Sequence, residues 1–552
     1  MGADVGYWTG AAQRQRAGGA GGVLAEDEAG ADSEAAPTVG VVEYLEGKRI
    51  FLSGATGFLA KILIEKVLYE QPAVGKIYVM IQSRGGASAQ ARLEGLLASP
   101  AFSRLAERHG ADYEAFMLSK LEAVEGNLGE AGLGLDAAVA ARLHREVDVV
   151  MNSAATTTFD EQLDTAIRVN TLGAREMVRF AQQCGVELFM QVSTAYVNGR
   201  RVGYTPEEPF TPNRSIAEEQ QGAAAPKLDV DYEIELALGA PAKYREEAAA
   251  LGLGEGEASL YVSKKVSELG MERARMHGWQ DTYVFTKAMG EMIIVRDRAD
   301  LGVAIMPPAI VEGAAHEPAK GWIEGLRMAD PIIISYGKGQ LKGFCGDTNG
   351  VLDIVPVDLV VNACLGAMAA AAKRKTDEVA VYHVATSVAN PLTNRMFVNL
   401  VNEHFKEQPM LDRQDEPIRL GQRMYLFPSV VSFMVTSWLR YMLPMKLVEL
   451  KRRLLAFLPF LPAAEVSKES RKQALINSKT YEQLEHFADI YSPYTFYKGR
   501  FGASNTMELH RSLSEEEQAK FNFNLQSVDW RAYLCDVHIP GLRKFVLKGR
   551  GT

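Results

Sequence analysis

The sequence predicts an α/β fold: a Rossmann-like, doubly wound parallel sheet with an insertion, followed by a mainly helical C-terminal domain. Two observations carry this prediction. Short apolar runs alternate with helical patterns through the front half, and the first run ends in a glycine turn that leads into a helix. A chain of 552 residues is long enough for two or more domains. We expect a disordered tail over 1–43, the sheet domain over 44–390 with its insertion at about 200–280, and the helical domain over 391–552.

The first strand and its turn lie in "KRIFLSGATGFLAK". Ile50 to Leu52 form an apolar run short enough for a buried strand, and Gly54 and Gly57 follow before a helical pattern. Such a turn brings backbone N–H groups close to a pyrophosphate at the helix N-terminus. A glycine turn that binds nothing is the alternative. The residues expected to hold the phosphates are Gly54, Ala55, Thr56, Gly57, Phe58 and Leu59.

Residues at the ends of the next strands bear on which ligand the sheet binds. After "KIYVMIQSR" an acidic residue would bind the ribose of NAD, whereas Arg84 suits the 2′-phosphate of NADP. An exposed arginine without a specific role is the alternative. Asn127 follows the third strand at a turn where adenine could be contacted, and Asn170 is expected to open a helix beside the cofactor. Ser193 and Thr194 end a later strand, where ligands of such sheets bind.

Two Tyr-x-x-x-Lys pairs occur, Tyr261 with Lys265 and Tyr283 with Lys287. Tyr-x-x-x-Lys is the signature pair of a large class of nicotinamide-dependent reductases. In these enzymes the tyrosine, with a reference pKa of about 10, donates a proton near neutral pH. A nearby ammonium group stabilises tyrosinate and lowers that pKa. The second pair precedes an apolar strand, whereas the first runs through a turn into another helix within the insertion. We therefore expect Tyr283 and Lys287 to be catalytic and Tyr261 to be a surface or packing tyrosine.

The composition narrows the function classes. The formal charge of −9 and a pI near 5.7 give no basic field for a nucleic acid. The acid-rich N-terminal stretch lacks the apolar core of a secretory signal, so a secreted protein is not expected. The four cysteines show no CxxC spacing, which predicts no metal site and a reducing compartment. They are Cys184, Cys345, Cys364 and Cys535.

Together with the Tyr283 segment "YVFTKAMGE", the motifs "GATGFLAK", "VSTAYVNG", "GWIEG" and "DIVPVDLV" resemble the alcohol-forming fatty acyl-CoA reductases, from about residue 44 to the end. The resemblance implies NADPH as cofactor and a fatty acyl-CoA as substrate, reduced through an aldehyde to a primary alcohol with release of CoA. Two positions depart from the family's pattern. Pro307-Pro308 stands where the family usually has Arg-Pro, and the arginine after the second strand is displaced to Arg84.

The resemblance also implies roles for the site residues. Thr194, with Ser193 as the alternate, would hydrogen-bond the substrate carbonyl. Tyr283 would donate the proton, and Lys287 would bind the cofactor ribose and tune the tyrosine. The glycine turn would hold the pyrophosphate of NADPH.

Other functions remain open from the sequence. An enzyme of the same fold, such as an epimerase or another dehydrogenase, would share the glycine turn and the Tyr-Lys pair. An acyl-CoA reductase that stops at the aldehyde is a second alternative. An NADP-binding sensor or scaffold without turnover is a third, although such proteins tend to lose the tyrosine or the lysine.

The stretch from 424 to 462 is the most apolar of the chain. Its uncharged part, Met424 to Leu439, is interrupted by Pro428, ends before Arg440 and is too short for a membrane-spanning helix of about 20 residues. Lysines and arginines among its apolar residues are typical of an element lying on an anionic lipid surface. A buried helical hairpin is the alternative. With lipid contact, the protein would be peripheral on the cytosolic side of a membrane such as the endoplasmic reticulum.

Overall fold

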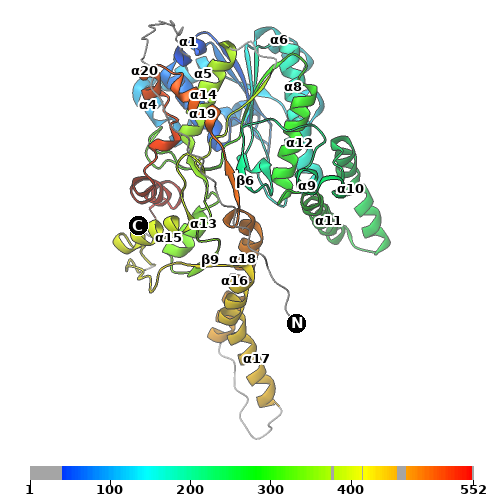
Figure 1. The fold of residues 1–552 in the computed structure, drawn as a ribbon, viewed down its shortest axis with the longest axis vertical. Helices are drawn as coiled ribbons and strands as arrows, with labels where there is room; N and C mark the ends of the chain where they lie inside the picture. The colour runs from blue at the N-terminus through cyan, green and yellow to red at the C-terminus, as the bar shows by residue number, and fades with distance from the viewer. Residues whose placement is uncertain (1–39, 374–377, 413, 457–467, 550–552) are drawn as a thin grey trace, which may run out of the picture. The chain divides into compact units, whose positions relative to one another are not determined.

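The computed structural model describes residues 40–373, 378–412, 414–456 and 468–549. Its centre is a seven-stranded parallel sheet in the order β11-β7-β5-β4-β1-β2-β3 (Figure 1). The strand order reverses between β1 and β4, which is the topology of a doubly wound fold. The strands are β1 (Arg49–Ser53), β2 (Lys76–Ile81), β3 (Leu121–Glu125), β4 (Val149–Asn152), β5 (Leu188–Val192), β7 (Gly302–Met306) and β11 (Val379–Val381).

Helices cover both faces of this sheet, as the alternating apolar runs predict (Figure 1). β1 shows how the two faces divide, because Ile50 and Leu52 belong to one buried cluster and Phe51 to the other. The ring of Phe51 lies 4.5 Å from that of Phe180. The first face carries α2 (Phe58–Glu70) and α14 (Val357–Lys373), and the second carries α6 (Ala137–Glu146), α8 (Gly173–Cys184) and α12 (Thr282–Asp297).

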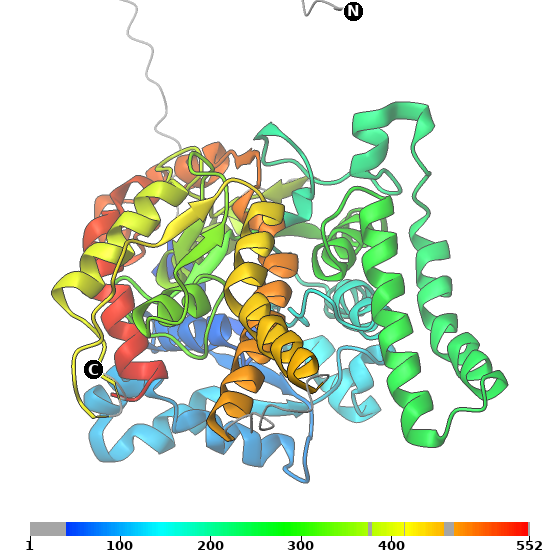
Figure 2. The ribbon, with the colours of Figure 1, turned by 90° about the horizontal axis from the view of Figure 1, so that it is seen from below.

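The insertion is a helical hairpin outside the sheet, and Figure 2 shows it at one side of the molecule. It consists of α9 (Ile216–Gln221), α10 (Val230–Ala250) and α11 (Glu255–Met276). Chain order then runs from α11 to α12 and directly into β7. The predicted placement of the two Tyr-Lys pairs on different helices is therefore confirmed.

The chain after residue 391 is mainly helical, as expected. Its helices are α15 (Asn394–Glu407), α16 (Val430–Ser437), α17 (Leu443–Ala456), α18 (Lys468–Thr495), α19 (Ser504–Arg511), α20 (Glu515–Lys520) and α21 (Ile539–Gly541). The described residues, from 40 to 549 with their gaps, belong to one compact unit. Within it β13 (Gly499–Phe501) pairs in parallel with β6 (Gly203–Thr205) from the front half. The boundary at 391 stays a prediction.

Shorter elements complete the described chain. The helices are α1 (Val41–Leu45), α3 (Ala89–Leu97), α4 (Ser103–His109), α5 (Tyr113–Lys120), α7 (Leu163–Ala166) and α13 (Asp330–Gly337). The strands are β8 (Ile310–Glu312), β9 (Gly343–Cys345), β10 (Ile354–Pro356) and β12 (Tyr425–Phe427), of which β8 pairs with β10 and β9 with β12.

Two sequence-based boundaries are wrong. The tail was expected to reach residue 43, but α1 begins at Val41, whose side chain is buried against the core. Asn170 was expected to open a helix. It lies instead within a π-helical turn, Ile167–Leu172, between α7 and α8, so the helix begins earlier, at Leu163. Asn170 therefore lies in the middle of a continuous helical segment, and its side chain contacts Thr156 and Thr286.

The apolar stretch from 424 is not a buried hairpin over its described part. α16, a short π-helical turn and α17 carry several strongly exposed apolar side chains, among them Val431 at 72% and Leu447 at 55%. Among the described residues, no helix is both long and apolar enough to cross a membrane. Positions 457–462 of the predicted lipid-contacting stretch lie outside the described residues.

Candidate active site

The glycine turn after β1 has the geometry of a phosphate cradle. Gly54 has a φ of +74°, and a Cβ there would lie 2.7 Å from the backbone nitrogen of Ala154 on the neighbouring loop. The Gly57 amide donates to the Gly54 carbonyl at 2.8 Å, and no side chain caps the first turn of α2. The open N–H groups at this helix end fit a pyrophosphate, as the sequence predicts for residues 54–59.

Side-chain hydrogen bonds tie together the carboxyl ends of the three central strands. Ser53 donates to Asn152 at 2.6 Å, and Asn152 donates to Gln191 at 2.9 Å. The Ser53 hydroxyl also accepts from the backbone of Ala154 at 3.1 Å. These contacts join β1, β4 and β5 where their loops diverge, so they fix the floor of the site at the switch point of the sheet.

α12 brings Lys287 to the end of β5. The Lys287 ammonium group donates to the Val192 carbonyl at 2.8 Å, directly before Ser193 and Thr194. Ser193 and Thr194 are both buried, and the hydroxyl of Thr194 accepts from the Tyr196 amide at 3.3 Å. The structure therefore brings Lys287 next to the two hydroxyl residues that sequence analysis placed at a strand end.

Tyr283 lies in the first turn of the same helix and is half-buried. Asp281 caps this helix by accepting from the Val284 amide at 3.0 Å, and it also accepts from the Tyr494 hydroxyl at 2.7 Å. Burial and the neighbouring Asp281 charge raise the pKa of Tyr283 above its usual value. Tyr283 is therefore protonated at neutral pH, the state that a proton donor requires. The Lys287 ammonium group, one turn along the helix, donates to the Val192 carbonyl.

Burial lowers the pKa of Lys287 to about 8, and the Glu291 carboxylate acts in the opposite direction. Glu291 is itself buried, and burial raises its pKa to about 7. The hydroxyl of Ser193 donates to Glu291. Glu291 is thus a residue of the site that sequence reasoning missed. Its position four residues after Lys287, on the same face of a helix, was the available signal.

Asn170 links the loop after β4 to α12. Its side-chain amide donates to Thr286 at 3.0 Å and to the Thr156 carbonyl at 3.1 Å, while its oxygen accepts from the Thr156 amide at 3.1 Å. Thr286 is on α12, the helix that carries Tyr283 and Lys287, and Thr156 is on the loop after β4. Asn170 therefore holds that helix against the sheet.

The first Tyr-Lys pair lies elsewhere. Tyr261 and Lys265 are on α11 of the insertion, where Tyr261 contacts Glu247 at 3.3 Å and Lys265 pairs with Glu268 at 3.1 Å. These are contacts along a surface hairpin, as expected for a packing tyrosine. The structure does not bring this pair to the ends of the sheet strands.

Two expected cofactor contacts lie at the outer strands of the sheet. Arg84 is exposed, three residues beyond the end of β2, in a tight turn with Ala87. Asn127 follows β3, but its side chain is held locally: it donates to Glu130 at 2.7 Å and accepts from the Gly129 amide at 3.1 Å. Arg84 is free to meet a phosphate, whereas Asn127 shapes its own turn.

An apolar cavity of ≈ 40 Å³ is lined by residues that follow Tyr283 in the chain, between 310 and 495. Tyr494 lines it and reaches Asp281, and its ring lies 5.3 Å from Phe159, which in turn lies 6.3 Å from the ring of Tyr283. The remaining lining comes from β8, α13, α15, β12 and the end of α18 and is mostly aliphatic or aromatic. Aromatic side chains therefore connect this cavity to Tyr283.

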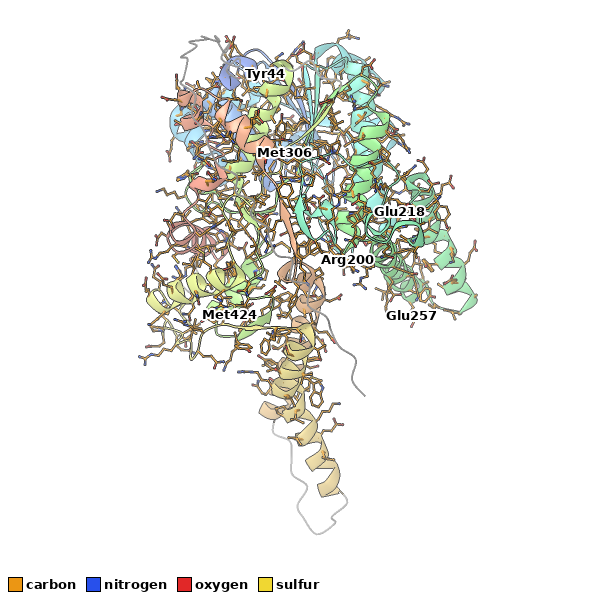
Figure 3. All side chains as sticks on the ribbon, in the orientation of Figure 1. Tyr44, Arg200, Glu218, Glu257, Met306 and Met424 are labelled. Atoms are coloured by element: carbon orange, nitrogen blue, oxygen red, sulfur yellow. The ribbon has the colours of Figure 1, made fainter. Side chains whose placement is uncertain are left out.

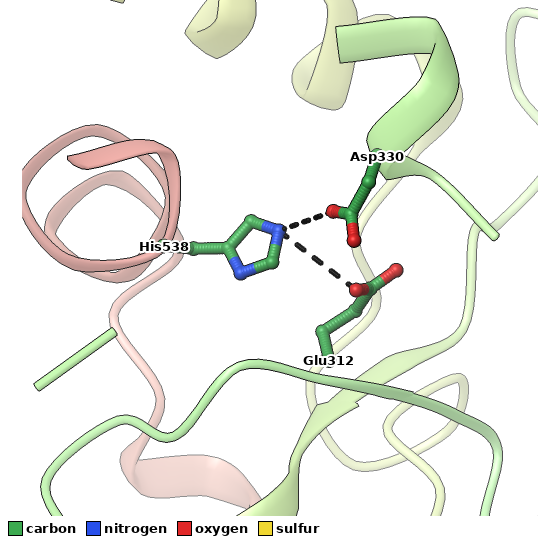
Figure 4. A group of neighbouring side chains, drawn as sticks. All are labelled: Glu312, Asp330 and His538. Atoms are coloured by element: carbon green, nitrogen blue, oxygen red, sulfur yellow. Dashed lines mark hydrogen bonds and ion pairs between the residues drawn. The ribbon is translucent and has the colours of Figure 1, made fainter. Parts of the chain in front are cut away.

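A second polar cluster is buried on β8 and α13, two elements that also line this cavity (Figure 4). His538 lies 2.9 Å from Asp330 and 3.8 Å from Glu312, and all three side chains are buried. Burial and the Asp330 charge raise the pKa of Glu312 well above its usual value, which favours its neutral form. The cluster ties the last helical segment of the chain to β8 and α13.

Two models of the male sterility protein family match the sequence, an NAD-binding model over residues 52–364 and a second one over 458–549. Fatty acyl-CoA reductase 2, chloroplastic, of Arabidopsis thaliana is 44% identical and covers 93% of this chain and 80% of its own. The chain belongs to the fatty acyl-CoA reductase family. The alcohol-forming fatty acyl-CoA reductase of Simmondsia chinensis is 32% identical, over 92% of this chain and 99% of its own.

Family membership makes the chain an oxidoreductase with an NAD(P)-binding domain, and the glycine turn of β1 lies within the NAD-binding match. The fold agrees. The terminal reductase domain of the myxalamid biosynthetic pathway matches with a TM-score of 0.53, over 94% of this chain and 97% of that one. At 16% identity this likeness establishes the arrangement of sheet and helices alone.

Proposed function

We propose that this member of the fatty acyl-CoA reductase family reduces a long-chain fatty acyl-CoA to the primary alcohol, with NADPH as reductant and release of CoA. The observation that carries the proposal is the contact of Lys287, on the helix of Tyr283, with Val192 at the carboxyl end of β5, together with the aromatic link from Tyr283 to Tyr494 of the apolar cavity. The relative from Simmondsia chinensis is named as alcohol-forming, which favours the alcohol over the aldehyde as product.

The residues of the site take distinct roles in this proposal. When bound, NADPH supplies the hydride, and the cradle from Gly54 to Gly57 holds its pyrophosphate. Thr194 and Tyr283 hydrogen-bond the carbonyl oxygen of the substrate and polarise it. Addition of the hydride to the thioester carbon gives a thiohemiacetal. Its collapse releases CoA and an aldehyde. In the second reduction Tyr283 gives its proton to the alkoxide oxygen, which completes the alcohol.

Lys287 and Glu291 support Tyr283 from the same helix. A protonated Lys287 stabilises the tyrosinate that forms when the proton leaves, and its side chain is placed to bind a ribose hydroxyl. Glu291 balances the buried ammonium charge and holds Ser193 through a hydrogen bond. Ser193 in turn sets the position of Thr194, its neighbour in the chain. No metal and no cysteine acyl-enzyme is needed for these steps.

NADPH rather than NADH is favoured by the residues after β2. Gln82, Ser83 and Arg84 occupy the positions where an acid would bind the ribose of NAD. Arg84 is exposed, and among the described residues no carboxylate pairs with it. An arginine of this kind suits the additional phosphate of NADP.

The apolar lining of the cavity beside Tyr494 supports an apolar substrate tail, of which a cavity of ≈ 40 Å³ can hold only a small part. We also propose a peripheral contact with lipid through the α16–α17 arm (Val430–Ala456), because its apolar side chains are exposed beside Arg440 and Lys446. Such a contact would let a water-insoluble alcohol leave into the membrane.

The test is turnover by the purified chain with palmitoyl-CoA, with NADPH or NADH, and product analysis by gas chromatography. We expect two NADPH consumed per palmitoyl-CoA, hexadecanol as product, and slower turnover with NADH. One NADPH with accumulated hexadecanal would identify an aldehyde-forming enzyme. No oxidation at any chain length, despite NADPH binding, would contradict the proposal and favour another substrate or a sensor.

A further inference from the structure

A pocket of ≈ 360 Å³ lies beside the residues that lead into α12. It is lined by Arg200 and Arg201 after β5, by Gln280 before α12 and by Tyr497 and Lys498 after α18. The end of α18 separates it from the apolar cavity, because Tyr491, Tyr494 and Thr495 line the cavity whereas Phe496 to Lys498 line the pocket. The two spaces therefore flank the same chain segment, and Gln280 in the lining of the pocket precedes α12.

Two buried polar side chains of this pocket have no partner among the described residues. Gln280 is 3% exposed, and neither its amide oxygen nor its amide nitrogen is hydrogen-bonded. The hydroxyl of Tyr497, a residue 8% exposed, is likewise unpartnered. In folded proteins nearly all buried polar groups are hydrogen-bonded. These buried donors and acceptors belong to residues that line the pocket, where a ligand with its own amide or hydroxyl groups would satisfy them.

The charge of the pocket is positive. Arg200, Arg201 and Lys498 contribute to its lining, and no Asp or Glu does. Arg201 pairs with Glu219 at 2.7 Å, but among the described residues no carboxylate forms an ion pair with Arg200 or Lys498. Both of these side chains are exposed, and Figure 3 shows Arg200 on the side of the sheet domain from which the α16–α17 arm extends. The rim of the pocket is therefore suited to an anion.

We propose that this pocket binds the phosphorylated pantetheine arm of the thioester substrate. Arg200 and Lys498 would meet its phosphate, and Gln280 and Tyr497 would hydrogen-bond its amides. The assignment rests on the proposed function, which makes the substrate a thioester. The dinucleotide is a poor alternative, because its phosphates are expected at residues 54–59 and none of these residues lines the pocket.

The position of the pocket agrees with this assignment. Gln280 precedes Tyr283 by three residues, so an arm that extends along Gln280 would bring its sulfur end toward the proton donor. The acyl chain beyond the thioester would then enter the apolar cavity past Tyr494. The polar arm and the first carbons of the acyl chain would thus occupy the two spaces on either side of the end of α18.

The double variant Arg200→Ala/Lys498→Ala tests the phosphate contact, because both side chains are exposed and their loss leaves the core intact. We expect its KM for palmitoyl-CoA to rise about fivefold or more, with unchanged KM for hexadecanal, which lacks the arm, and for NADPH. Lys243→Ala/Lys264→Ala on the distant hairpin is the matched control and should leave all three values unchanged. Gln280→Leu should also raise the KM for palmitoyl-CoA more than the KM for hexadecanal.

Calorimetry with free CoA and with 4′-phosphopantetheine separates this inference from the proposed function. Binding of both compounds by the full chain, weakened in the Arg200→Ala/Lys498→Ala variant, supports the pocket even if turnover is absent. Normal turnover of palmitoyl-CoA with unchanged KM in that variant would overturn the pocket and leave the function standing. Binding of CoA without any binding of 4′-phosphopantetheine would also overturn it, since recognition would then lie in the adenosine end.

Discussion

At the scale of residues, the site depends on one helical face with titratable groups at intervals of four. Tyr283, Lys287 and Glu291 follow one another along α12, and the last two are buried. Burial moves the pKa of Lys287 down to about 8 and that of Glu291 up to about 7. Both shifts bring two pKa values that ordinarily lie far apart into the neutral pH range, where the charge of each group depends on that of the other. The reaction is therefore expected to depend on pH through this pair.

We predict that the rate of reduction falls as the pH rises through about 8, because Lys287 loses the proton that lets it stabilise tyrosinate. The negative charge of Glu291 raises the pKa of Lys287, so Glu291→Gln removes that support. The alkaline fall in kcat/KM should then move to lower pH. Profiles of kcat/KM against pH for the two proteins measure the shift. Glu257→Gln, a change at an exposed residue of α11, is the control. If kcat/KM falls at the same alkaline pH in the wild type, Glu291→Gln and Glu257→Gln, the role of Glu291 is contradicted.

At the scale of elements, the α16–α17 arm carries an apolar stripe that the described residues do not cover. Val431, Val435 and Leu439 are spaced by four residues and are at least 50% exposed, at 72%, 53% and 50%. Trp438 extends the stripe, and Arg440 is exposed beside it. Continuous apolar surface of this kind marks an interaction site in soluble proteins. A tryptophan and a cation at its edge are typical of helices that lie on a lipid surface.

We expect Val435→Glu/Leu439→Glu to reduce binding to vesicles of phosphatidylcholine and phosphatidylserine by about tenfold or more, because two apolar side chains no longer leave water. Co-sedimentation of the purified chain with vesicles measures the change. Leu260→Glu on α11 is the matched control, since Leu260 is 74% exposed outside the arm. Equal co-sedimentation of the arm variant and the wild type would rule out lipid contact through this stripe.

At the scale of the whole molecule, local patterns predicted what depends on neighbours in the sequence. The parallel strands, the glycine turn, the helical hairpin and the strand end at Ser193 and Thr194 all follow from short apolar runs and their flanking residues. Strand ends of one sheet meet in space, so the placement of these hydroxyls needed no further information. The family resemblance added the substrate class, which no local pattern contains.

Contacts between distant parts of the chain were out of reach of such patterns. The Tyr494 hydroxyl meets Asp281, and β13 pairs with β6 across almost three hundred residues. The aromatic link through Phe159 joins a third segment. None of these residues is marked by periodicity or by a motif, because each contact is decided by how separate elements pack.

The central claim is that one of two Tyr-Lys pairs does the chemistry, and parallel assays of Tyr283→Phe and Tyr261→Phe test it most directly. Each variant is measured for NADPH binding by fluorescence titration and for hexadecanol formation from palmitoyl-CoA. We expect Tyr283→Phe still to bind NADPH but to lose about a hundredfold or more of its turnover, the usual contribution of a proton donor. Tyr261→Phe should match the wild type in both assays. Full turnover by Tyr283→Phe, or its loss in Tyr261→Phe, would contradict the account.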